Sequence, residues 1–476
     1  MKTFAIILCF FIIQMAVILL LEFRRPQRTV AWLFILLCCP PLGLLFYYFF
    51  GRDYMQTQQF NKRKIPALRE IREHVEKRSL VVTSAEACGN PEFEHHKDLL
   101  QLFSSLPRSP ITGKNKSQLL FKGHEAYNLM FQAMESAQEH IHVEFYTVSD
   151  DQIGTKFQEI MIRKARQGVK VRLLCDGIGS LKLSRKYVSA LKKGGVDVHF
   201  FLPPLLSLME RRLNYRNHRK IVVVDGMIGF TGGMNIADDY LGRDSKLGDW
   251  RDTHLQLEGD SVYFLQFVFL KDWQMASGER IIHPRMFPAH SCETSEAIKI
   301  IESGPDQALD TTKEIYFASL CAAKQRIWIT TPYFIPDAPI VSALKSARLR
   351  GVDVRVMIPK KPDTWLVYYA SLSYVQDLQE AGVKFYCYRK GFIHAKVMIV
   401  DDLLASVGSA NLDMRSLYSN FECSALLLHP ERISAIADQY KEDMQDSEYL
   451  DPVSFKNRGR LHKFKENICN LLSPLL

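Results

Sequence analysis

The chain of 476 residues lacks the cysteine patterns that indicate a disulfide framework or a zinc site. Its ten cysteines are scattered, and none of them forms a C-x-x-C pair. The composition is that of a globular protein, with 47% hydrophobic and 24% charged residues, which excludes disorder and collagen-like order. This cysteine usage is typical of a reducing compartment.

A strong excess of charge of either sign is also missing. The chain has 61 Lys+Arg and 52 Asp+Glu, which gives a net charge of +9. This surplus fits an anionic partner such as lipid headgroups or nucleic acid, but it does not choose between them.

Two long hydrophobic runs occupy the N-terminus, at residues 4–21 and 31–50. At 1.5 Å per residue, each run is close to the roughly 30 Å that spans the hydrocarbon layer. A cleaved secretory signal is disfavoured because no A-x-A-like site follows the first run. The sequence therefore predicts that residues 1–50 form a hairpin of two transmembrane helices, the second kinked near Pro40.

The orientation of this hairpin is nearly balanced. Three arginines lie between the two runs, and several basic residues follow the second run from Arg52 onward. Each group favours the cytoplasmic side. The cysteines, which have no evident partners, favour a body in the cytoplasm.

The rest of the chain is a tandem repeat that follows a charged connector at residues 51–110. Residues 137–174 and 323–357 each contain an apolar strand pattern, a helical pattern and a second strand pattern after a glycine. This alternation predicts an α/β fold with a mainly parallel sheet. The copies are offset by about 180 residues, so each is one domain. We expect domains at 111–295 and 296–452, and a basic amphipathic C-terminal segment at 453–476.

Both copies carry the motif H-x-K-x4-D-x6-G-[GS]-x-N, which places eight polar residues at matched positions. They are His218, Lys220, Asp225 and Asn235 in the first copy and His394, Lys396, Asp401 and Asn411 in the second. A single H-x-K-x4-D pattern could arise by chance. Two extended copies at the domain period indicate a function.

The spacing suggests the chemistry of the motif. A β-branched run after each His-x-Lys predicts a strand on which the histidine and the lysine project to one side. The aspartate marks a turn, so a hairpin would return the asparagine towards its histidine. Lysines and amides suit a phosphate, and paired histidines suit a nucleophile that faces an acid/base partner. Two histidines beside lysines make a poor cation site, so we expect no metal and no cofactor.

Two carboxylates follow the motifs at similar distances. Asp252 lies 34 residues after His218, and Glu422 lies 28 residues after His394. A nucleophilic histidine needs an acceptor at its other ring nitrogen, and we predict that these carboxylates supply it. The alternative is an ordinary surface carboxylate.

Two apolar features have two readings each. Residues 461–472 have apolar side chains at helical spacing among lysines and arginines, which fits a membrane-surface helix or a helix packed on the body. The apolar segment 202–209 precedes the first motif, and we expect it to contact lipid and not to be buried in the core.

The doubled H-x-K-x4-D motif resembles the phospholipase D superfamily over residues 111–450. Several further segments are similar to bacterial cardiolipin synthases of that superfamily, namely the N-terminal hairpin, 214–218, 250–254, 331–334 and 391–396. The resemblance implies two tandem α/β domains, each a mixed sheet flanked by helices. A pseudo-twofold axis would relate them, and the active site would lie at their interface.

The resemblance also implies a reaction without metal through a phosphohistidine. His218 would be the nucleophile and His394 the acid, although the near symmetry of the site allows the reverse. The lysines and asparagines of the motifs would hold phosphoryl oxygens, and the motif aspartates would support the structure.

The implied substrate is phosphatidylglycerol, used as donor and as acceptor at the bacterial plasma membrane, with release of glycerol. A hydrolytic phospholipase D, or a transferase that uses another alcohol, would share every catalytic residue. The membrane hairpin disfavours a nuclease, so we expect no nucleic-acid partner.

Overall fold

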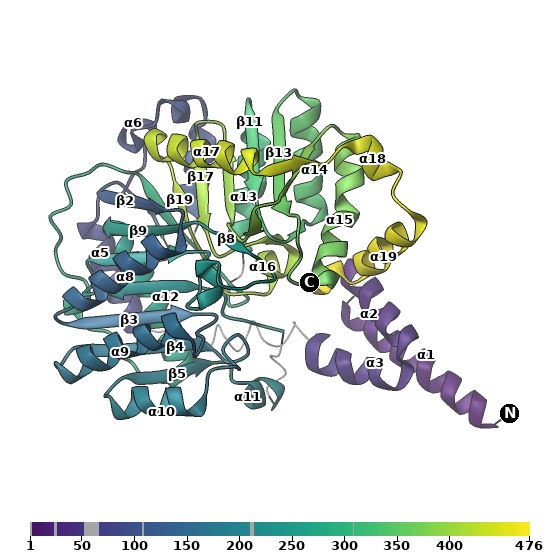
Figure 1. Ribbon diagram of the computed structural model, residues 1–476, viewed down its shortest axis with the longest axis horizontal. Coiled ribbons are helices and arrows are strands. Elements are labelled where there is room, and N and C mark those ends of the chain that lie inside the picture. The colour runs from purple at the N-terminus through teal and green to yellow at the C-terminus, as the bar shows by residue number, and fades with distance from the viewer. Residues whose placement is uncertain (1, 23–25, 52–65, 107–108, 210–213, 308) are drawn as a thin grey trace.

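Two α/β units form the body of the molecule (Figure 1). The computed structural model describes residues 2–22, 26–51, 66–106, 109–209, 214–307 and 309–476. One unit, drawn in blue and teal, carries a seven-stranded sheet, and the other, drawn mainly in green and yellow, carries a nine-stranded sheet. The purple N-terminal helices project from one corner of the body, beside the C-terminus.

The first sheet has the strand order β2-β9-β7-β6-β3-β4-β5. Its strands are β2 (Asn115–Leu120), β3 (His140–Phe145), β4 (Lys170–Asp176), β5 (Asp197–Phe201), β6 (Lys220–Val224), β7 (Ile228–Gly232) and β9 (His254–Gly259). The pairs β3–β4 and β4–β5 are parallel, and the remaining neighbours are antiparallel.

The second sheet has the order β1-β10-β19-β17-β16-β11-β13-β14-β20. Its strands are β1 (Ile111–Thr112), β10 (Ile298–Ser303), β11 (Arg326–Thr330), β13 (Asp353–Pro359), β14 (Lys384–Tyr388), β16 (Val397–Val400), β17 (Leu404–Gly408), β19 (Glu422–Leu427) and β20 (Ser447–Tyr449). Again only two pairs are parallel, β11–β13 and β13–β14.

Both sheets are therefore mixed, and the expectation of mainly parallel sheets was wrong. The strand–helix–strand units that the sequence revealed are parallel, as expected. The motif strands form antiparallel hairpins, β6–β7 and β16–β17, and these add antiparallel neighbours to each sheet. A tight turn can connect only antiparallel strands.

The helices cover the faces of the sheets (Figure 1). In the first unit they are α8 (Gly123–Ser136), α9 (Gln152–Arg166), α10 (Arg185–Lys193), α11 (Pro204–Met209) and α12 (Asp260–Ser277). In the second unit they are α13 (Thr311–Ala322), α14 (Ala338–Leu349), α15 (Trp365–Glu380), α16 (Met414–Tyr418), α17 (Pro430–Gln445), α18 (Pro452–Lys456) and α19 (Arg460–Leu471).

The helices between the parallel strands begin and end as their sequences predict. The side chains of Asp151 and Asp337 cap α9 and α14 by accepting a backbone N–H of the first turn. Gly168 and Gly351 follow the two helices with φ of 95° and 93°, a conformation that L side chains rarely adopt.

The two units share strands and a core. β8 (Asp249–Arg251) of the first unit pairs in parallel with β15 (Gly391–Ile393) of the second. A single hydrophobic cluster contains Ile221 and Leu257 from the first sheet together with Ile300 and Val407 from the second. The interface between the units is therefore a continuous core.

Part of the predicted connector packs on the second unit. The connector contains α5 (Pro66–Arg78), which packs against α12 of the first unit, and α6 (Ala85–Cys88) and α7 (Lys97–Ser105), which pack on the second unit. Leu99, Leu100 and Phe103 of α7 are buried in the core of the second unit.

The N-terminal segment consists of short helical pieces after α1 (Lys2–Glu22). α2 (Pro26–Cys38) ends two residues before Pro40, and α3 (Pro40–Phe46) and a π-helical turn (Tyr47–Gly51) follow. The second predicted span, 31–50, is thus interrupted where the sequence predicted a kink, because proline cannot continue the hydrogen-bond ladder of a helix. Within the described parts of the chain, no helix is long and apolar enough to cross a membrane.

The C-terminal helix α19 packs on the body through Glu466 and Cys469, which are buried. Arg458 pairs with Glu466. The apolar positions Leu461 and Phe464 remain 66% and 61% exposed. The first half of the predicted apolar stripe is therefore exposed, whereas Ile468 and Leu472 in its second half are half-buried.

The segment 202–209 before the first motif divides between the core and the surface. Leu202 is buried, whereas Leu205 of α11 is 72% exposed and Leu208 is 38% exposed.

Candidate active site

Each motif histidine lies on a segment that leaves its own sheet and bonds to the other unit. The backbone N–H of His218 donates to the carbonyl of Phe421, at 2.9 Å. The N–H of His394 donates to the carbonyl of Arg251, at 2.7 Å. The prediction that the histidines lie on strands with their lysines was wrong, because β6 begins only at Lys220 and β16 only at Val397. The interface between the units holds the histidines.

Each motif histidine also contacts a carboxylate of the other unit. Nδ1 of His218 lies 3.0 and 3.1 Å from the carboxylate oxygens of Glu422. Nδ1 of His394 lies 2.7 Å from Oδ2 of Asp252. Both predicted carboxylates thus contact a motif histidine, but each contacts the histidine of the other copy. This pairing has a local cause. Each carboxylate is the next residue after the one whose backbone carbonyl accepts the N–H of the histidine from the other unit.

This pairing fixes the tautomer of both imidazoles. An ionised carboxylate only accepts hydrogen bonds, so Nδ1 carries the proton and Nε2 keeps its lone pair. Burial, opposed by Glu422 and assisted by Lys220, lowers the pKa of His218 from its ordinary 6.5 to about 4. Burial, followed by Lys396, lowers the pKa of His394 to about 3. Both rings are therefore neutral at neutral pH.

The carboxylates stay ionised. Burial alone would raise the pKa of Glu422, but His218 and Lys220 hold it below its ordinary value. His394 and Lys396 do the same for Asp252 against the opposing effect of burial.

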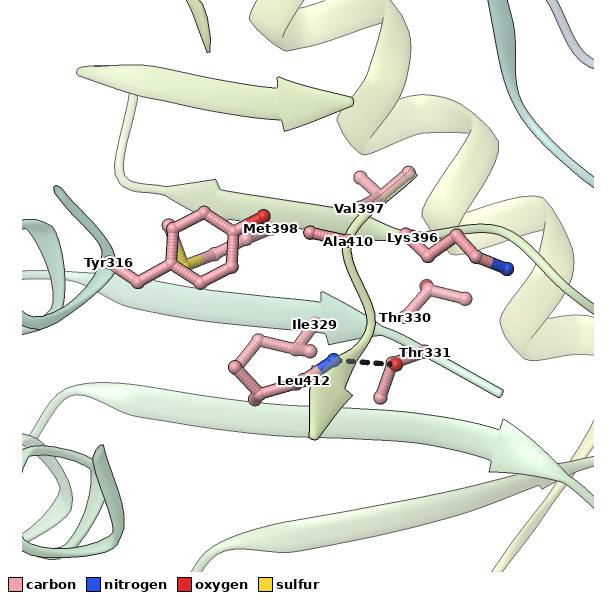
Figure 2. Close-up of a pocket in the computed structure, with 9 residues that line it drawn as sticks. All are labelled: Tyr316, Ile329, Thr330, Thr331, Lys396, Val397, Met398, Ala410 and Leu412. Carbon is pink, nitrogen blue, oxygen red and sulfur yellow. Dashed lines mark hydrogen bonds between the residues drawn. The ribbon is translucent and has the colours of Figure 1, made fainter. Parts of the chain in front are cut away.

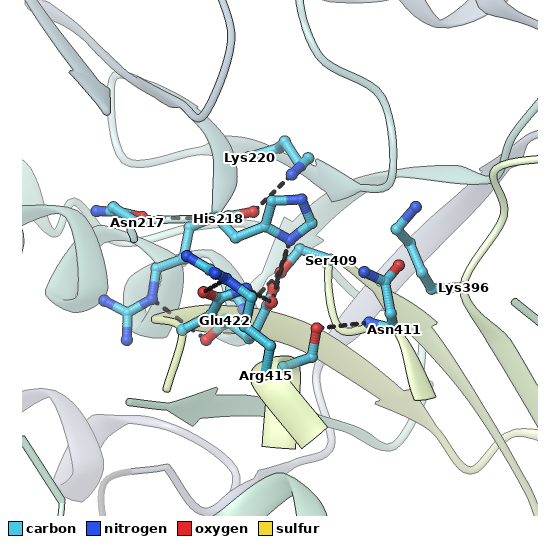
Figure 3. A network of polar contacts seen from close by, with 12 residues as sticks. Asn217, His218, Lys220, Lys396, Ser409, Asn411, Arg415 and Glu422 are labelled. Carbon is cyan, nitrogen blue, oxygen red and sulfur yellow. Dashed lines mark hydrogen bonds and ion pairs between the residues drawn. The ribbon is translucent and has the colours of Figure 1, made fainter. Parts of the chain in front are cut away.

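Lys220 and Lys396 supply positive charge between the two units. Their ammonium groups donate to the carbonyls of His218 and His394, at 2.6 and 2.5 Å. Burial lowers the pKa of Lys220 to about 7 and that of Lys396 to about 8. Figure 3 shows Lys220, Lys396 and Asn411 gathered around the His218 imidazole. An anionic ligand placed there would favour the protonated lysines.

A second set of side chains holds Glu422 in place. The hydroxyl of Ser409 donates to Oε2 of Glu422, and Nδ2 of Asn420 donates to Oε1 at 3.1 Å. Nε of Arg415 in turn donates to Oδ1 of Asn420, at 3.1 Å. The sequence reasoning missed Arg415 and Asn420. Ser409 occupies the variable [GS] position of the motif. This position was the only feature of the sequence that could have indicated a contact with Glu422.

The corresponding position of the first copy is Gly233, which lies against Asp252. A Cβ on Gly233 would lie 2.0 Å from Oδ1 of Asp252, so only glycine fits there. The backbone N–H of Thr253 donates to Asp252 at 2.7 Å. The two copies thus support their carboxylates differently.

The motif asparagines are both buried beside the site. Asn235 accepts from the Thr147 N–H at 3.1 Å and donates to the Tyr240 hydroxyl. Asn411 donates to Asp413 at 3.1 Å, and its Oδ1 has no hydrogen-bond partner within the described residues. Each amide nitrogen therefore has one N–H committed and one left for a ligand.

The motif aspartates stand at the far ends of the hairpins, away from the imidazoles. Asp225 and Asp401 have φ of 52° and 50° in the hairpin turns. Each accepts three backbone N–H groups, of residues 138–140 and 324–326, at 2.7 to 2.8 Å. They tie each hairpin to the start of the neighbouring strand.

Aromatic rings surround His394 more completely than His218. The ring centroids of Tyr240, Trp250 and Phe392 lie 5.7, 5.2 and 6.0 Å from that of His394. Of the residues that the structure describes, only Tyr146 packs its ring against that of His218, with the centroids 5.0 Å apart.

A small cavity below Lys396 is too small for a substrate. It measures about 10 Å3, roughly the room of one water molecule. Figure 2 shows Lys396 at one end and Tyr316 at the other, with the Leu412 N–H donating to Thr331 between them.

The site combines two neutral imidazoles, each oriented by a carboxylate, with two lysines that suit an anion. No group of three or more metal-ligating side chains occurs in the described ranges. Two oriented imidazoles beside an anion site suit an enzyme that transfers phosphoryl groups.

Comparison with known proteins identifies the family within this class. The family described as "Cardiolipin synthase, PLD-like domain" matches residues 130–246 and 316–446. The family described as "Phospholipase_D-nuclease N-terminal" matches residues 4–52. The chain belongs to the cardiolipin synthase family of the phospholipase D superfamily.

Similar proteins agree with this assignment over almost the whole chain. The cardiolipin synthase of Geobacillus thermodenitrificans is 41% identical over 99% of this chain and 94% of its own length. The probable cardiolipin synthase of Bacillus subtilis is 39% identical over 96% of this chain and 90% of its own. The crystal structure of a phosphatidylserine synthase from Haemophilus influenzae shares the fold, with a TM-score of 0.62 and 15% identity over 80% of this chain and all of that one.

Proposed function

We propose that the chain joins two phosphatidylglycerol molecules to give cardiolipin and glycerol. The observation that carries the proposal is the pair of carboxylate-oriented histidines at the interface, His218 with Glu422 and His394 with Asp252. Relatives called cardiolipin synthases are about 40% identical over nearly the full chain.

In the first step, Nε2 of His218 attacks the phosphorus of one phosphatidylglycerol. The N–P bond forms, and the P–O bond to the headgroup glycerol breaks. His394 gives the proton on its Nε2 to the leaving glycerol oxygen, so it must enter this step as the imidazolium. The bound phosphate and Asp252 both favour that cation.

In the second step, His394 acts as the base and a new alcohol attacks the phosphohistidine. The glycerol hydroxyl of a second phosphatidylglycerol loses its proton to Nε2 of His394 and attacks the phosphohistidine. The N–P bond breaks, cardiolipin leaves, and His218 is neutral again. Water in place of the second lipid would give phosphatidic acid.

The assignment of roles rests on the surroundings of the two rings. Ser409 and Asn420 hold Glu422 against His218, which preorganises the nucleophile. His394 is then the acid, and the negative charge of the bound phosphate must favour its imidazolium, because burial lowers the pKa of this ring to about 3.

The other motif residues hold the substrate and the fold. Lys220 and Lys396 neutralise the nonbridging phosphoryl oxygens, and the free amide N–H groups of Asn235 and Asn411 reach the same oxygens. Asp225 and Asp401 hold the hairpins on which these groups are mounted.

The N-terminal segment anchors the enzyme to the bacterial plasma membrane, with the body in the cytoplasm. The support is the sequence, which has two apolar runs within residues 1–50 and ten cysteines with no disulfide. An anchor confines the enzyme to the surface that concentrates both lipid substrates.

The test is turnover of phosphatidylglycerol, labelled in its headgroup glycerol and in its phosphate, as the only lipid. Transfer predicts labelled cardiolipin and one free glycerol for each cardiolipin formed. Phosphatidic acid as the main product would show a hydrolase instead. His218→Ala and His394→Ala proteins are the controls, and substantial activity in either would contradict the two-histidine mechanism.

A further inference from the structure

A groove of about 280 Å3 lies where the N-terminal helices meet the second unit. It is lined by Trp32 and Ile35 of α2, Phe46 of α3, Leu475 near the C-terminus, and Asn214 and Arg415. The part along the helices is apolar, and the end towards the catalytic body is polar.

We propose that this groove binds an acyl chain and the adjoining ester of the phosphatidylglycerol that His218 attacks. This inference rests on the proposed function and names a substrate site for it. It commits to a diacyl phospholipid as the occupant.

The polar end of the groove leads directly to the nucleophile. Arg415 donates to Asn420, Asn420 donates to Glu422, and Glu422 accepts from His218. Figure 3 shows Arg415 beside Glu422, below the His218 ring. A lipid with its chain in the groove would bring its anionic end to the Arg415 guanidinium, beside the residues that hold His218 through Nδ1.

Trp32 supplies a specific contact for the ester. Its side chain is buried, and its indole N–H has no hydrogen-bond partner in the part of the chain that the structure describes. A buried donor without an acceptor is unfavourable, and an ester carbonyl accepts a hydrogen bond without offering one. A glycerophospholipid has an acyl chain, an ester carbonyl and a phosphate, and the lining of the groove offers apolar side chains, an indole N–H and a guanidinium that suit these three parts.

The size of the groove fits part of a lipid and not a whole one. Ligand pockets usually measure about 300–1,000 Å3, and this groove lies just below that range. The rest of the lipid would remain in the bilayer, next to the helices that we propose as the anchor.

The test compares a variant that fills the groove with a control on the same helix. Ile35→Phe adds a ring to the lining, whereas Leu37→Phe makes a similar change at a position that is 66% exposed and outside the lining. We expect Ile35→Phe to lower kcat/KM for long-chain phosphatidylglycerol about tenfold, as displacement of one or two buried methylenes would. Activity on dihexanoyl phosphatidylglycerol should change less than about twofold, which also shows that the variant folds. Leu37→Phe should leave both activities unchanged.

Binding is measured separately, by quenching of Trp32 fluorescence with phosphatidylglycerol that carries brominated acyl chains. The Trp32→Phe protein gives the contribution of the other tryptophans. Quenching should be strong in the wild type and reduced in Ile35→Phe. Equal quenching in both would show that micelle lipid surrounds Trp32 non-specifically. Protection from quenching as protein concentration rises would show that a second copy occupies the groove. Either result, or an equal loss of activity on both lipids, overturns the inference.

The two proposals can fail separately. A wild-type protein with groove-dependent quenching that releases phosphatidic acid would uphold the groove and contradict the transferase. Cardiolipin synthesis without groove-dependent quenching would uphold the transferase and contradict the groove.

Discussion

At the scale of single residues, each motif histidine depends on a carboxylate from the other repeat. A carboxylate at Nδ1 leaves the Nε2 lone pair free to act. Glu422 has two additional side-chain donors, Ser409 and Asn420. Asp252 has its neighbouring backbone N–H and the close contact with Gly233 instead.

Replacement of Glu422 by Gln should lower kcat by about 100- to 10,000-fold, because an amide can present its N–H to Nδ1 and stabilise the wrong tautomer. Asp252→Asn should act in the same way through His394. The imidazole N–H resonances of protein with labelled histidine identify the pairs. Glu422→Gln should move the resonance of His218 and leave that of His394 in place. The reverse assignment would contradict the exchanged pairing.

The lysines predict how activity depends on pH. Substrate capture needs protonated lysines and a neutral nucleophile. The pKa values of Lys220 and Lys396 are about 7 and about 8, so kcat/KM should fall as pH rises through this range. The pKa of His218 is about 4, so no comparable fall is expected just below neutral pH.

Lys396→Arg gives the control for this profile. Arginine keeps its charge, so the alkaline fall of kcat/KM should move to higher pH even if the maximal rate is lower. An unchanged alkaline limb in Lys396→Arg would show that another group controls it.

At the scale of elements, the two motif hairpins are alike in sequence but not interchangeable. The residue after the first motif glycine of each hairpin touches a catalytic carboxylate. Ser409 can do so because its hydroxyl donates to Glu422. Gly233 has no room for a side chain beside Asp252.

Gly233→Ser should therefore lower activity strongly, although serine is the residue that the second motif has at the same position. A Cβ placed 2.0 Å from Oδ1 of Asp252 must displace that carboxylate from His394. Ser409→Ala loses only one hydrogen bond to a charged group, about 1.5–3 kcal/mol, or roughly 10- to 150-fold in rate. Activity measured on proteins with the same melting temperature should fall further in Gly233→Ser. Equal activities would contradict the asymmetry of the copies.

Much of the fold was readable from local patterns. The repeat period, the strand–helix–strand units and the hairpin turns at Asp225 and Asp401 all depend on near neighbours in the chain. The motif lysines were found from spacing, and the two carboxylates from spacing together with the family resemblance, and all four contact the motif histidines or their backbone in the structure.

Contacts between distant segments were not readable. Which carboxylate contacts which histidine depends on how the two units pack together. No local pattern of the sequence indicates this packing. Arg415 and Asn420 have no motif around them, so their place behind Glu422 is visible only in three dimensions. The packing of α7 was not predicted either, because its leucines lie in a segment that the sequence indicated to be a charged connector.

At the scale of the whole molecule, the two repeats are two halves of one site. The strands β8 and β15 pair across the interface, and buried Arg219, which pairs with Asp272 of its own unit, also pairs with Glu302 of the other unit. Neither repeat alone could orient its own histidine. Duplication of the fold therefore produces an active site that neither copy has by itself.

The most direct test of this account is to trap the covalent intermediate. Protein mixed with phosphatidylglycerol labelled in its phosphate should, after denaturing quench under conditions that preserve phosphohistidine, carry label on His218. His394→Ala should slow both steps, and His218→Ala should carry no label. We expect a peptide map to place the phosphatidyl group at residue 218 of the wild type. No label on any histidine of an active enzyme would contradict covalent transfer, and label on His394 alone would reverse the roles that we assign.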